Sequence, residues 1–337
     1  MVISRTKYPI TEPQIRDIFA KAGLGPVSTI RTLGAGEFNA VFAVEAGERT
    51  YALKVAAPNT AVQIYEQNMM ESELAWYDLI QSHTDIRTPK IHYRDLSRTL
   101  IPTNYFIMEF LPGCQKDQLT LNENQQLLAD QQLARMHAKI HRIPGPGFGY
   151  PQSGLKENWY EGLRHILENL REDARRAGYA MPRLDPVMAW LDVFRPILEA
   201  VPCRLISFDG WDPNFISIGE DSDHPEFAWI DPERCFWGDP VLDFVPLDIG
   251  HIHLDDKTAV LEAYNALAEF PILPDAKTRI RYGFGLSYLA AIMECERYYR
   301  YTPENPIWER NSQNADLFYN LAFRIFEENK EAAIGHF

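Results

Sequence analysis

The hydrophobic residues of this 337-residue chain follow a strand-like pattern before residue 111 and a helical pattern after it. Four early segments are rich in β-branched and aromatic residues and predict strands: 38–46, 49–57, 90–95 and 104–110. Gly47 and Glu48 join the first two segments, which predicts a β-hairpin. Apolar residues at helical spacing predict helices over 12–22, capped by Thr11, and over 61–82.

The sequence LPG at 111–113 interrupts this pattern, and helical spacing dominates beyond it. Three later segments are helix-like: 119–143, 155–200 and 256–333. Thr120 and Glu123 have the spacing of a capping box at the start of the first of them. We therefore predict an α+β fold with two domains, a small antiparallel β-rich lobe over 1–110 and a larger α-helical lobe over 111–337.

The composition is that of a folded globular protein, with 46% hydrophobic and 12% aromatic residues. No signal-like segment opens the chain, and no apolar run is long enough to cross a bilayer, so we expect a cytoplasmic protein without a membrane partner. The four cysteines are far apart, which argues against a zinc knuckle or a disulfide scaffold. A formal net charge of -14 disfavours nucleic acid as a partner and favours a cationic small molecule.

The segment LGAGEFNAVFAV carries Gly34 and Gly36, with Asn39 where a G-x-G-x-x-G pattern would have its third glycine. A dinucleotide-binding fingerprint leads into a helix, whereas this segment leads into a predicted strand, so the Rossmann interpretation is excluded. Glycines at a hairpin tip allow backbone N–H groups to approach phosphates closely. An ordinary glycine-containing turn is the alternative.

Lys54 interrupts the apolar strand YALKVA and needs a partner if it is half-buried. The predicted helix that follows offers Glu66, Glu71 and Glu73. Glu73 heads the apolar run ELAWYDLI, along the face that would pack inward. We therefore predict an ion pair between Lys54 and Glu73, with Glu71 as the alternative partner.

The segment LISFDGWDPNFISI, residues 205–218, places Asp209 and Asn214 in a tight turn between two apolar runs. Phosphoryl transfer needs a carboxylate to orient the acceptor hydroxyl and hard oxygen ligands to hold Mg²⁺. Asp209 and Asn214 can supply these groups, and Asp231, at the end of the buried-looking strand FAWI, can supply a third oxygen. We interpret Asp212 as a turn residue that stabilises the loop.

Taken together, these motifs resemble the aminoglycoside phosphotransferase and choline kinase-like family, whose members are relatives of the protein kinases. The resemblance rests on LGAGEFNAVFAV, on Lys54 and Glu73, on FDGWDPN, and on WIDPE followed by GDPVLDF. It spans roughly residues 30–245 with the motifs in the family's order. It implies a bilobal protein-kinase-like fold, with ATP bound in the cleft between a nucleotide-binding N-lobe and a C-lobe that holds the catalytic loop and the substrate helices.

The resemblance also implies a role for individual residues. It makes Asp209 the catalytic carboxylate, and Asn214 and Asp231 the Mg²⁺ ligands. It further implies a set of nucleotide-binding positions in the glycine loop, the Lys54–Glu73 pair and the hinge MEFLPG: Gly34, Gly36, Asn39, Lys54, Glu73, Glu109 and Leu111. Asp239 and Asp243, in GDPVLDF, match positions that tie down the loop, and His137 matches a structural histidine.

The chain departs from the family pattern at Ser207 and Phe208, where the family usually has His-Gly before the catalytic Asp. That histidine supports the loop and does not touch phosphate or metal. A serine can serve there with weaker hydrogen bonding.

Three other functions are less consistent with the sequence. The segment HIHLDD, 251–256, is similar to a zinc-hydrolase signature, but it lacks the last histidine and runs into a predicted helix. A non-catalytic kinase-like binding protein would have no reason to keep the buried charges described above. Protein-kinase activity is disfavoured because the chain has no H-R-D, D-F-G or A-P-E motif.

We therefore predict an ATP- and Mg²⁺-dependent phosphotransferase that acts on a hydroxyl of a small molecule. Acidic residues after residue 245 could receive amino groups of the acceptor: Asp248, Asp255, Asp256, Glu294 and Glu296. An aminoglycoside-like or amino-alcohol acceptor is the resulting expectation, although homoserine, a methylthio-sugar or a macrolide would fit the same acidity.

Overall fold

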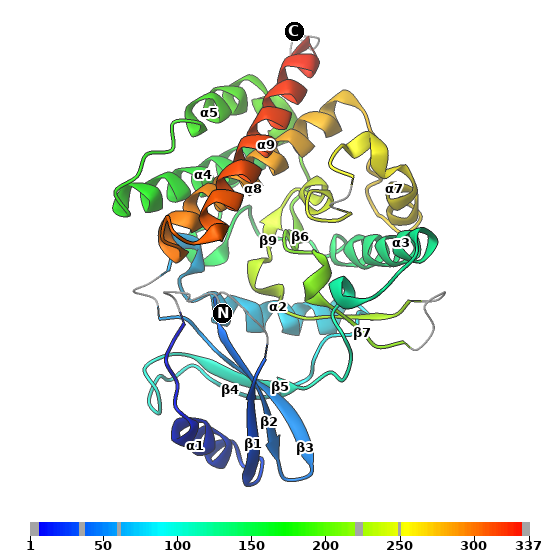
Figure 1. Ribbon diagram of the computed structural model, residues 1–337. Coiled ribbons are helices and arrows are strands. Elements are labelled where there is room, and N and C mark those ends of the chain that lie inside the picture. The colour runs from blue at the N-terminus through cyan, green and yellow to red at the C-terminus, as the bar shows by residue number, and fades with distance from the viewer. Residues whose placement is uncertain (1–6, 34–37, 59–61, 220–224, 249–250, 332–337) are drawn as a thin grey trace.

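The computed structural model describes residues 7–33, 38–58, 62–219, 225–248 and 251–331. It has two lobes, a smaller one built on a five-stranded antiparallel sheet and a larger one built mainly of helices (Figure 1). The predicted two-lobed α+β fold is therefore confirmed. Within the described ranges, none of the helices combines the length and hydropathy needed to span a membrane.

The sheet of the smaller lobe has the strand order β1-β2-β3-β5-β4, and each neighbouring pair is antiparallel. Its strands match the four predicted segments and add one: β1 (Val27–Thr32), β2 (Ala40–Ala46), β3 (Arg49–Val55), β4 (Ile91–Asp95) and β5 (Tyr105–Glu109). Two helices accompany the sheet: α1 (Glu12–Ala22) and α2 (Met69–His83). Thr11 caps α1, as the sequence predicts.

Alternation of side chains along β3 determines which residues face each helix. Leu53 belongs to an apolar cluster with Phe19 of α1. Ala52, which points to the opposite face, belongs to a second cluster with Leu74 of α2. Lys54 has the same parity as Ala52, so the strand directs its side chain toward α2.

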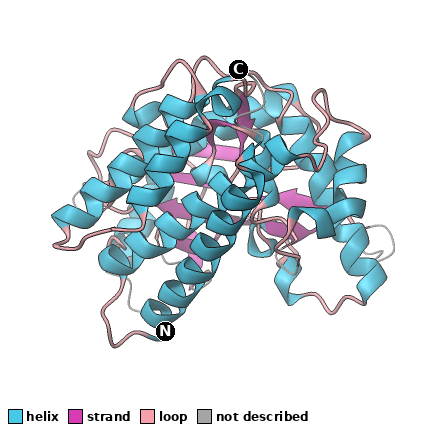
Figure 2. Ribbon diagram, turned by 90° about the horizontal axis from the view of Figure 1, so that it is seen from above, coloured by secondary structure: helices cyan, strands magenta, loops and turns pink. Residues whose placement is uncertain are grey.

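The larger lobe contains helices at its centre and along its outer side: α3 (Glu123–Ile140), α4 (Trp159–Arg176), α5 (Leu184–Val193), α6 (Arg195–Glu199), α7 (Thr258–Asn265), α8 (Ala276–Arg300) and α9 (Pro306–Asn329). The long helices α8 and α9 pack side by side, and α4 also contacts α8. Seen from above, the helices lie over most of the strands (Figure 2).

Two short antiparallel strand pairs lie in the larger lobe. They are β6 (Arg204–Ile206) with β9 (Phe236–Gly238), and β7 (Phe215–Ser217) with β8 (Phe227–Trp229). The loop 207–214 joins β6 to β7, and the segment 230–235 joins β8 to β9. Since β6 pairs with β9 and β7 pairs with β8, the loop 207–214 and the segment 230–235 connect the same two strand pairs and lie next to each other.

The loop 207–214 is held in place by a buried carboxylate. Asp243 accepts hydrogen bonds from the backbone N–H groups of Ser207 at 2.9 Å and Phe208 at 2.6 Å, and it lies 2.9 Å from Nε2 of His141. Nε2 of His137 lies 3.1 Å from Oγ of Ser207. Phe208 has a left-handed φ of 46°, which these contacts hold in place. His137 of α3 thus provides the partner for Ser207, which stands where the resemblance described above would have a histidine.

The segment preceding α2 differs from the helix predicted over 61–82. The helix α2 begins only at Met69, and a short 3₁₀ helix, Ile64–Glu66, precedes it. Asn68 has a left-handed φ of 55° and separates the two helices. The helix-like segments predicted over 155–200 and 256–333 also divide into three helices each, α4 to α6 and α7 to α9. Gly178, with a φ of 83°, follows the end of α4 and illustrates how such a break is made.

The capping box predicted at Thr120 and Glu123 is wrong by two residues. Asn122 caps α3, and Gln125 completes the box. Both pairs have the three-residue spacing of the motif, so the spacing alone does not select between them.

Replacing Asp243 with alanine should destabilise the protein by about 3–5 kcal/mol, because it leaves the N–H groups of Ser207 and Phe208 buried without their acceptor. Denaturant unfolding followed by circular dichroism would measure the loss. Asp185→Ala is the matched control, since Asp185 pairs with Arg171 on the surface and should cost at most about 1 kcal/mol. Equal losses in the two variants would contradict the supporting role of Asp243.

Candidate active site

Lys54 lies at the centre of the candidate site and is surrounded by carboxylates. Its Nζ is 2.9 Å from Oε1 of Glu73 and 2.9 Å from Oε2 of Glu233, and it also bonds to Asp231. The predicted pair between Lys54 and Glu73 is therefore present. The alternative partner, Glu71, instead accepts a hydrogen bond from Asn104.

Burial and charge act in opposite directions on Lys54. Its side chain is only 2% exposed, and burial disfavours the ammonium form. The carboxylates of Asp231, Glu233 and Glu73 outweigh that penalty and raise the pKa of Lys54 well above its usual value. Lys54 is therefore a permanent cation in the folded protein.

The three carboxylates carry more negative charge than one lysine can balance. Oxygen atoms of Glu73, Asp231 and Glu233 lie within 4.8 Å of one another, and this is the one such potential metal-ligand group within the described part of the chain. Burial, with the charge of Asp231, raises the pKa of Glu233 to about 7. A site with surplus carboxylate oxygens fits a hard divalent cation such as Mg²⁺.

Asp231 is held at its position by the backbone. It has a left-handed φ of 61°, and its N–H donates to the hydroxyl of Tyr77 at 2.9 Å. The residue thus turns the chain from β8 into the 3₁₀ helix Pro232–Arg234 and directs its carboxylate to Lys54. Its side chain is 35% exposed, which leaves one side accessible to a ligand.

Asp209 and Asn214 meet within the loop 207–214. Nδ2 of Asn214 donates to Oδ2 of Asp209 at 3.0 Å and to its backbone carbonyl at 2.9 Å. Burial, together with the charges of Asp231 and Glu233, raises the pKa of Asp209 to about 7, while Arg234 opposes that rise. Asp209 therefore lies in the same electrostatic environment as the carboxylates around Lys54.

Other predicted residues occupy different positions. Nδ2 of Asn39 donates to Oε2 of Glu233 at 2.5 Å, so Asn39 reaches the carboxylate cluster. Glu109 lies three residues along β5 from Phe106, which pairs with Lys54, and it binds Arg87. Glu109 and the half-buried Leu111 after it therefore lie about 10 Å or more along the strand from Lys54. Gly34 and Gly36 fall outside the described residues.

Asp212 stabilises the loop by a different means from the predicted turn. Its carboxylate accepts a hydrogen bond from Nζ of Lys116 at 2.6 Å, and Lys116 also pairs with Asp130 at 2.9 Å. This ion pair attaches the loop to the segment that follows β5.

Sequence reasoning missed Glu233 and Arg234 as site residues. Glu233 reaches Lys54, and Nε of Arg234 is 3.9 Å from Oδ2 of Asp209. The signal was present in FAWIDPERCFW, where three charged residues stand within four positions of an otherwise apolar run. Two adjacent charges beside Asp231 need partners for the same reason that Lys54 does.

The segment HIHLDD does not form a metal cluster in the described ranges. His251 pairs with Asp248 at 3.0 Å, and Asp255 pairs with Arg279. The candidate metal position is instead the carboxylate group at Lys54, which includes the predicted ligand Asp231 but not Asn214. This arrangement gives no support to a zinc hydrolase.

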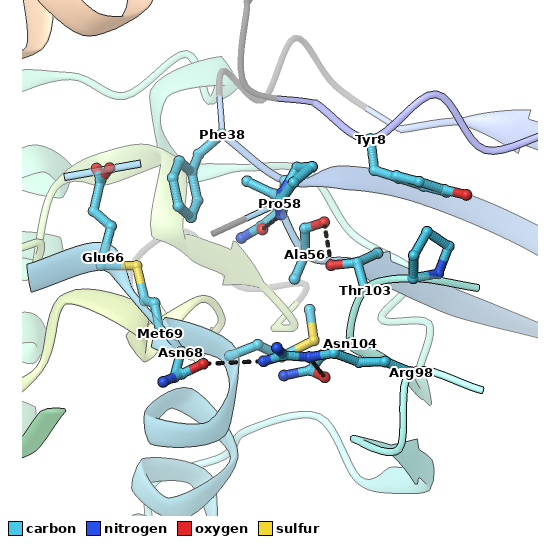
Figure 3. Close-up of a pocket in the computed structure, with 14 residues that line it drawn as sticks. Tyr8, Phe38, Ala56, Pro58, Glu66, Asn68, Met69, Arg98, Thr103 and Asn104 are labelled. Carbon is cyan, nitrogen blue, oxygen red and sulfur yellow. Dashed lines mark hydrogen bonds between the residues drawn. The ribbon is translucent and has the colours of Figure 1, made fainter. Parts of the chain in front are cut away.

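A cavity of about 320 Å³ adjoins the site on the side of the smaller lobe. Figure 3 shows Phe38 and Met69 at one side of it and Tyr8 at the other. Arg98 bonds to Asn68 and Asn104 in its wall, so these polar groups satisfy one another. The cavity shares Asn39 with the carboxylate cluster, but neither Asp209 nor Asn214 lines it.

Solved structures with the same fold include several small-molecule kinases. The chain is similar to a microcompartment-associated aminopropanol kinase, with 18% identity, 94% of this chain and 98% of that chain covered, and a TM-score of 0.63. It is similar to ADP-bound aminoglycoside phosphotransferase APH(2'')-Ib, with 15% identity, 94% and 99% covered, and a TM-score of 0.61. At these identities the likeness establishes the fold, which is kinase-like.

A further structural relative is aminoglycoside phosphotransferase APH(2'')-IIIa in complex with GDP and kanamycin, at 13% identity, with 94% and 97% of the two chains covered and a TM-score of 0.58. No curated protein matches the sequence. The family described as "Phosphotransferase enzyme family" matches residues 29–282, about three quarters of the chain. The motifs, the fold and this match agree, and the chain belongs to the phosphotransferase enzyme family.

Proposed function

We propose that this phosphotransferase uses Mg²⁺-bound ATP and transfers its γ-phosphoryl group to a hydroxyl group of a small molecule. The observation that carries the proposal is that Lys54, Asp209 and Asp231 belong to one cluster of charges. Lys54 and Asp231 are more than 150 positions apart in the sequence. Burying so many charged groups is expensive unless they bind charged ligands.

Each residue of the cluster has a proposed task. Asp209 accepts the hydrogen bond of the acceptor hydroxyl and aims its oxygen at the γ-phosphorus. Lys54, held by Glu73, neutralises the phosphate chain of the nucleotide. Asn214 and Asp231 would hold Mg²⁺, which supplies charge neutralisation along the phosphates when bound.

The nucleotide-binding positions outside the cluster follow from the resemblance. Gly34 and Gly36 would place backbone N–H groups against the phosphates, and Asn39 would support that loop through Glu233. Glu109 and Leu111 would bind the adenine through their backbone. Structural relatives bound to ADP and to GDP support a purine nucleotide at this position.

For the acceptor we propose a hydroxyl compound that carries an amino group. The relatives named for aminopropanol and kanamycin support this class. Most acidic residues expected to receive amino groups are already paired with basic side chains: Asp248 with His251, Asp255 with Arg279, Glu294 with Arg297 and Glu296 with Arg234. The late aromatic residues are also occupied, because Arg297 stacks over Tyr298 and Trp308.

Asp209→Asn should lower phosphoryl transfer by about 100- to 10,000-fold, since the amide cannot accept the proton of the acceptor hydroxyl. It should leave ATP affinity within about twofold, because Asp209 does not contact Lys54 directly. The measurement is ADP release with Mg·ATP against a panel of aminoglycosides, amino alcohols, homoserine, amino sugars and macrolides.

Asp78→Asn is the matched control for Asp209→Asn, because Asp78 is an exposed carboxylate that pairs with Arg94. Its turnover should equal that of the wild type. Undiminished turnover in Asp209→Asn would refute the catalytic assignment. Nucleotide binding without ADP release for any compound would instead favour a binding protein.

Asp231→Asn should weaken nucleotide affinity about 10- to 100-fold at fixed Mg²⁺ while changing it little in EDTA, because the lost oxygen belongs to the metal ligands. Isothermal titration of ATP at several Mg²⁺ concentrations measures both values. An Mg²⁺ dependence equal to that of the wild type would remove Asp231 from the ligand set.

A further inference from the structure

Arg234 begins a row of alternating charges that runs from Asp209 into the larger lobe. Nε of Arg234 is 3.9 Å from Oδ2 of Asp209, and its Nη2 bonds to Glu296 of α8. Glu296 lies 3.4 Å from Arg300, one helical turn further along α8. Arg300 in turn bonds to Glu66, just before α2. The row therefore connects the reacting carboxylate to both lobes.

The guanidinium of Arg234 is held at one end and available at the other. Its one hydrogen bond to a described residue goes to Glu296. The 3.9 Å separation from Asp209 exceeds a hydrogen bond, so that carboxylate does not occupy the remaining donors. The side chain of Arg234 is 15% exposed to solvent. Lys54 is different, because three carboxylates already surround its ammonium.

The other end of the row is rigid. Glu296 lies between two arginines, Arg234 and Arg300. Arg300 is 5.1 Å from the ring centroid of Phe38 and bonds to Glu66, so it is fixed by both packing and charge. Arg234, which this fixed glutamate holds, therefore loses little conformational entropy when it binds a ligand.

The position of Arg234 matters because of where charge accumulates during phosphoryl transfer. Charge spreads over the three equatorial oxygens of the transferring group. The acceptor oxygen, held by Asp209, must meet phosphorus beside that carboxylate. A planar guanidinium with donors in a fork matches two phosphoryl oxygens at once.

Resting on the function proposed above, we propose that Arg234 is a further catalytic residue that binds the phosphoryl group as it leaves ATP, and that Glu296 is its positioning residue. The bond from the γ-phosphorus to the β–γ bridging oxygen breaks, and its electron pair leaves with ADP. The acceptor oxygen forms the new bond to phosphorus, and its proton passes to Asp209. Arg234 remains protonated throughout and contributes charge and hydrogen bonds only.

Arg234→Met should lower the transfer rate by about 100- to 1,000-fold and leave ADP affinity within about twofold, because ADP lacks the group that Arg234 binds. Affinity for a non-hydrolysable ATP analogue should fall several-fold more than affinity for ADP. Binding is measured by titration with Mg²⁺ on the full chain. The rate is measured as ADP release, with the best compound of the panel or with water as acceptor.

Chemical rescue separates the guanidinium from the fold. In Arg234→Ala, millimolar guanidinium chloride should restore part of the rate without changing the unfolding midpoint. Glu296→Gln, which keeps an acceptor for Arg234, should retain more activity than Glu296→Ala at equal ADP affinity. Higher activity in Glu296→Gln than in Glu296→Ala, at equal ADP affinity, is expected if Glu296 positions Arg234 and not if its role is purely structural.

Arg297→Met is the matched control, since Arg297 is 13% exposed and also pairs with a glutamate of α8. It should lower the unfolding midpoint and leave the rate per folded molecule unchanged. The proposal is overturned if Arg234→Met behaves in the same way. It is also overturned if that variant raises only the acceptor KM, because the anion would then belong to the acceptor.

The two proposals fail in different ways. A wild type that binds neither Mg·ATP nor its analogue refutes the proposed function, and the role of Arg234 with it. A wild type that binds and transfers, beside an Arg234→Met variant with the same transfer rate and the same preference between the ATP analogue and ADP, refutes the role of Arg234 alone.

Discussion

The contact between Lys54 and three carboxylates is the interaction on which the rest of the site depends. Glu73 comes from α2, and Asp231 and Glu233 come from the segment between β8 and β9, so the ammonium joins both lobes. Breaking such a buried cluster at one member is costly because the other charges lose their partner. The smaller lobe is therefore bound to the larger one by Lys54, the group to which the function proposed above assigns the phosphates of the nucleotide.

The same contact sets the electrostatics of the neighbouring residues. One ammonium does not balance three carboxylates, and burial together with this surplus raises the pKa values of Glu233 and Asp209. Cations that enter from outside would relieve the surplus, which is the property expected of a magnesium and nucleotide site. Arg234 supplies the one positive charge paired with Asp209 within the described residues.

The sequence was sufficient to predict the features that depend on local periodicity. Alternation along YALKVA places Lys54 on the face of α2, and the helical spacing after Glu73 places that carboxylate inward, so their pairing could be predicted. Register within a repeated polar pattern could not, which is why the cap of α3 is at Asn122 and not at Thr120. Asn68, which delays the start of α2, adopts a left-handed conformation, and its side chain accepts a hydrogen bond from the distant Arg98.

Contacts between distant segments lay beyond the sequence for the same reason. The serine at 207 looked like a weakened loop support, yet His137 of α3 lies within hydrogen-bond distance of its hydroxyl and Asp243 accepts its N–H. Glu296 looked like a surface acid free to bind an amino group, yet two arginines neutralise it. Acidic composition is therefore a poor guide to the acceptor here, because folding pairs most of these carboxylates with basic side chains of the chain. Under the function proposed above, selection of the acceptor would therefore rest on the groups beside Asp209, where the carboxylates of Asp231 and Glu233 and the guanidinium of Arg234 all act on that residue.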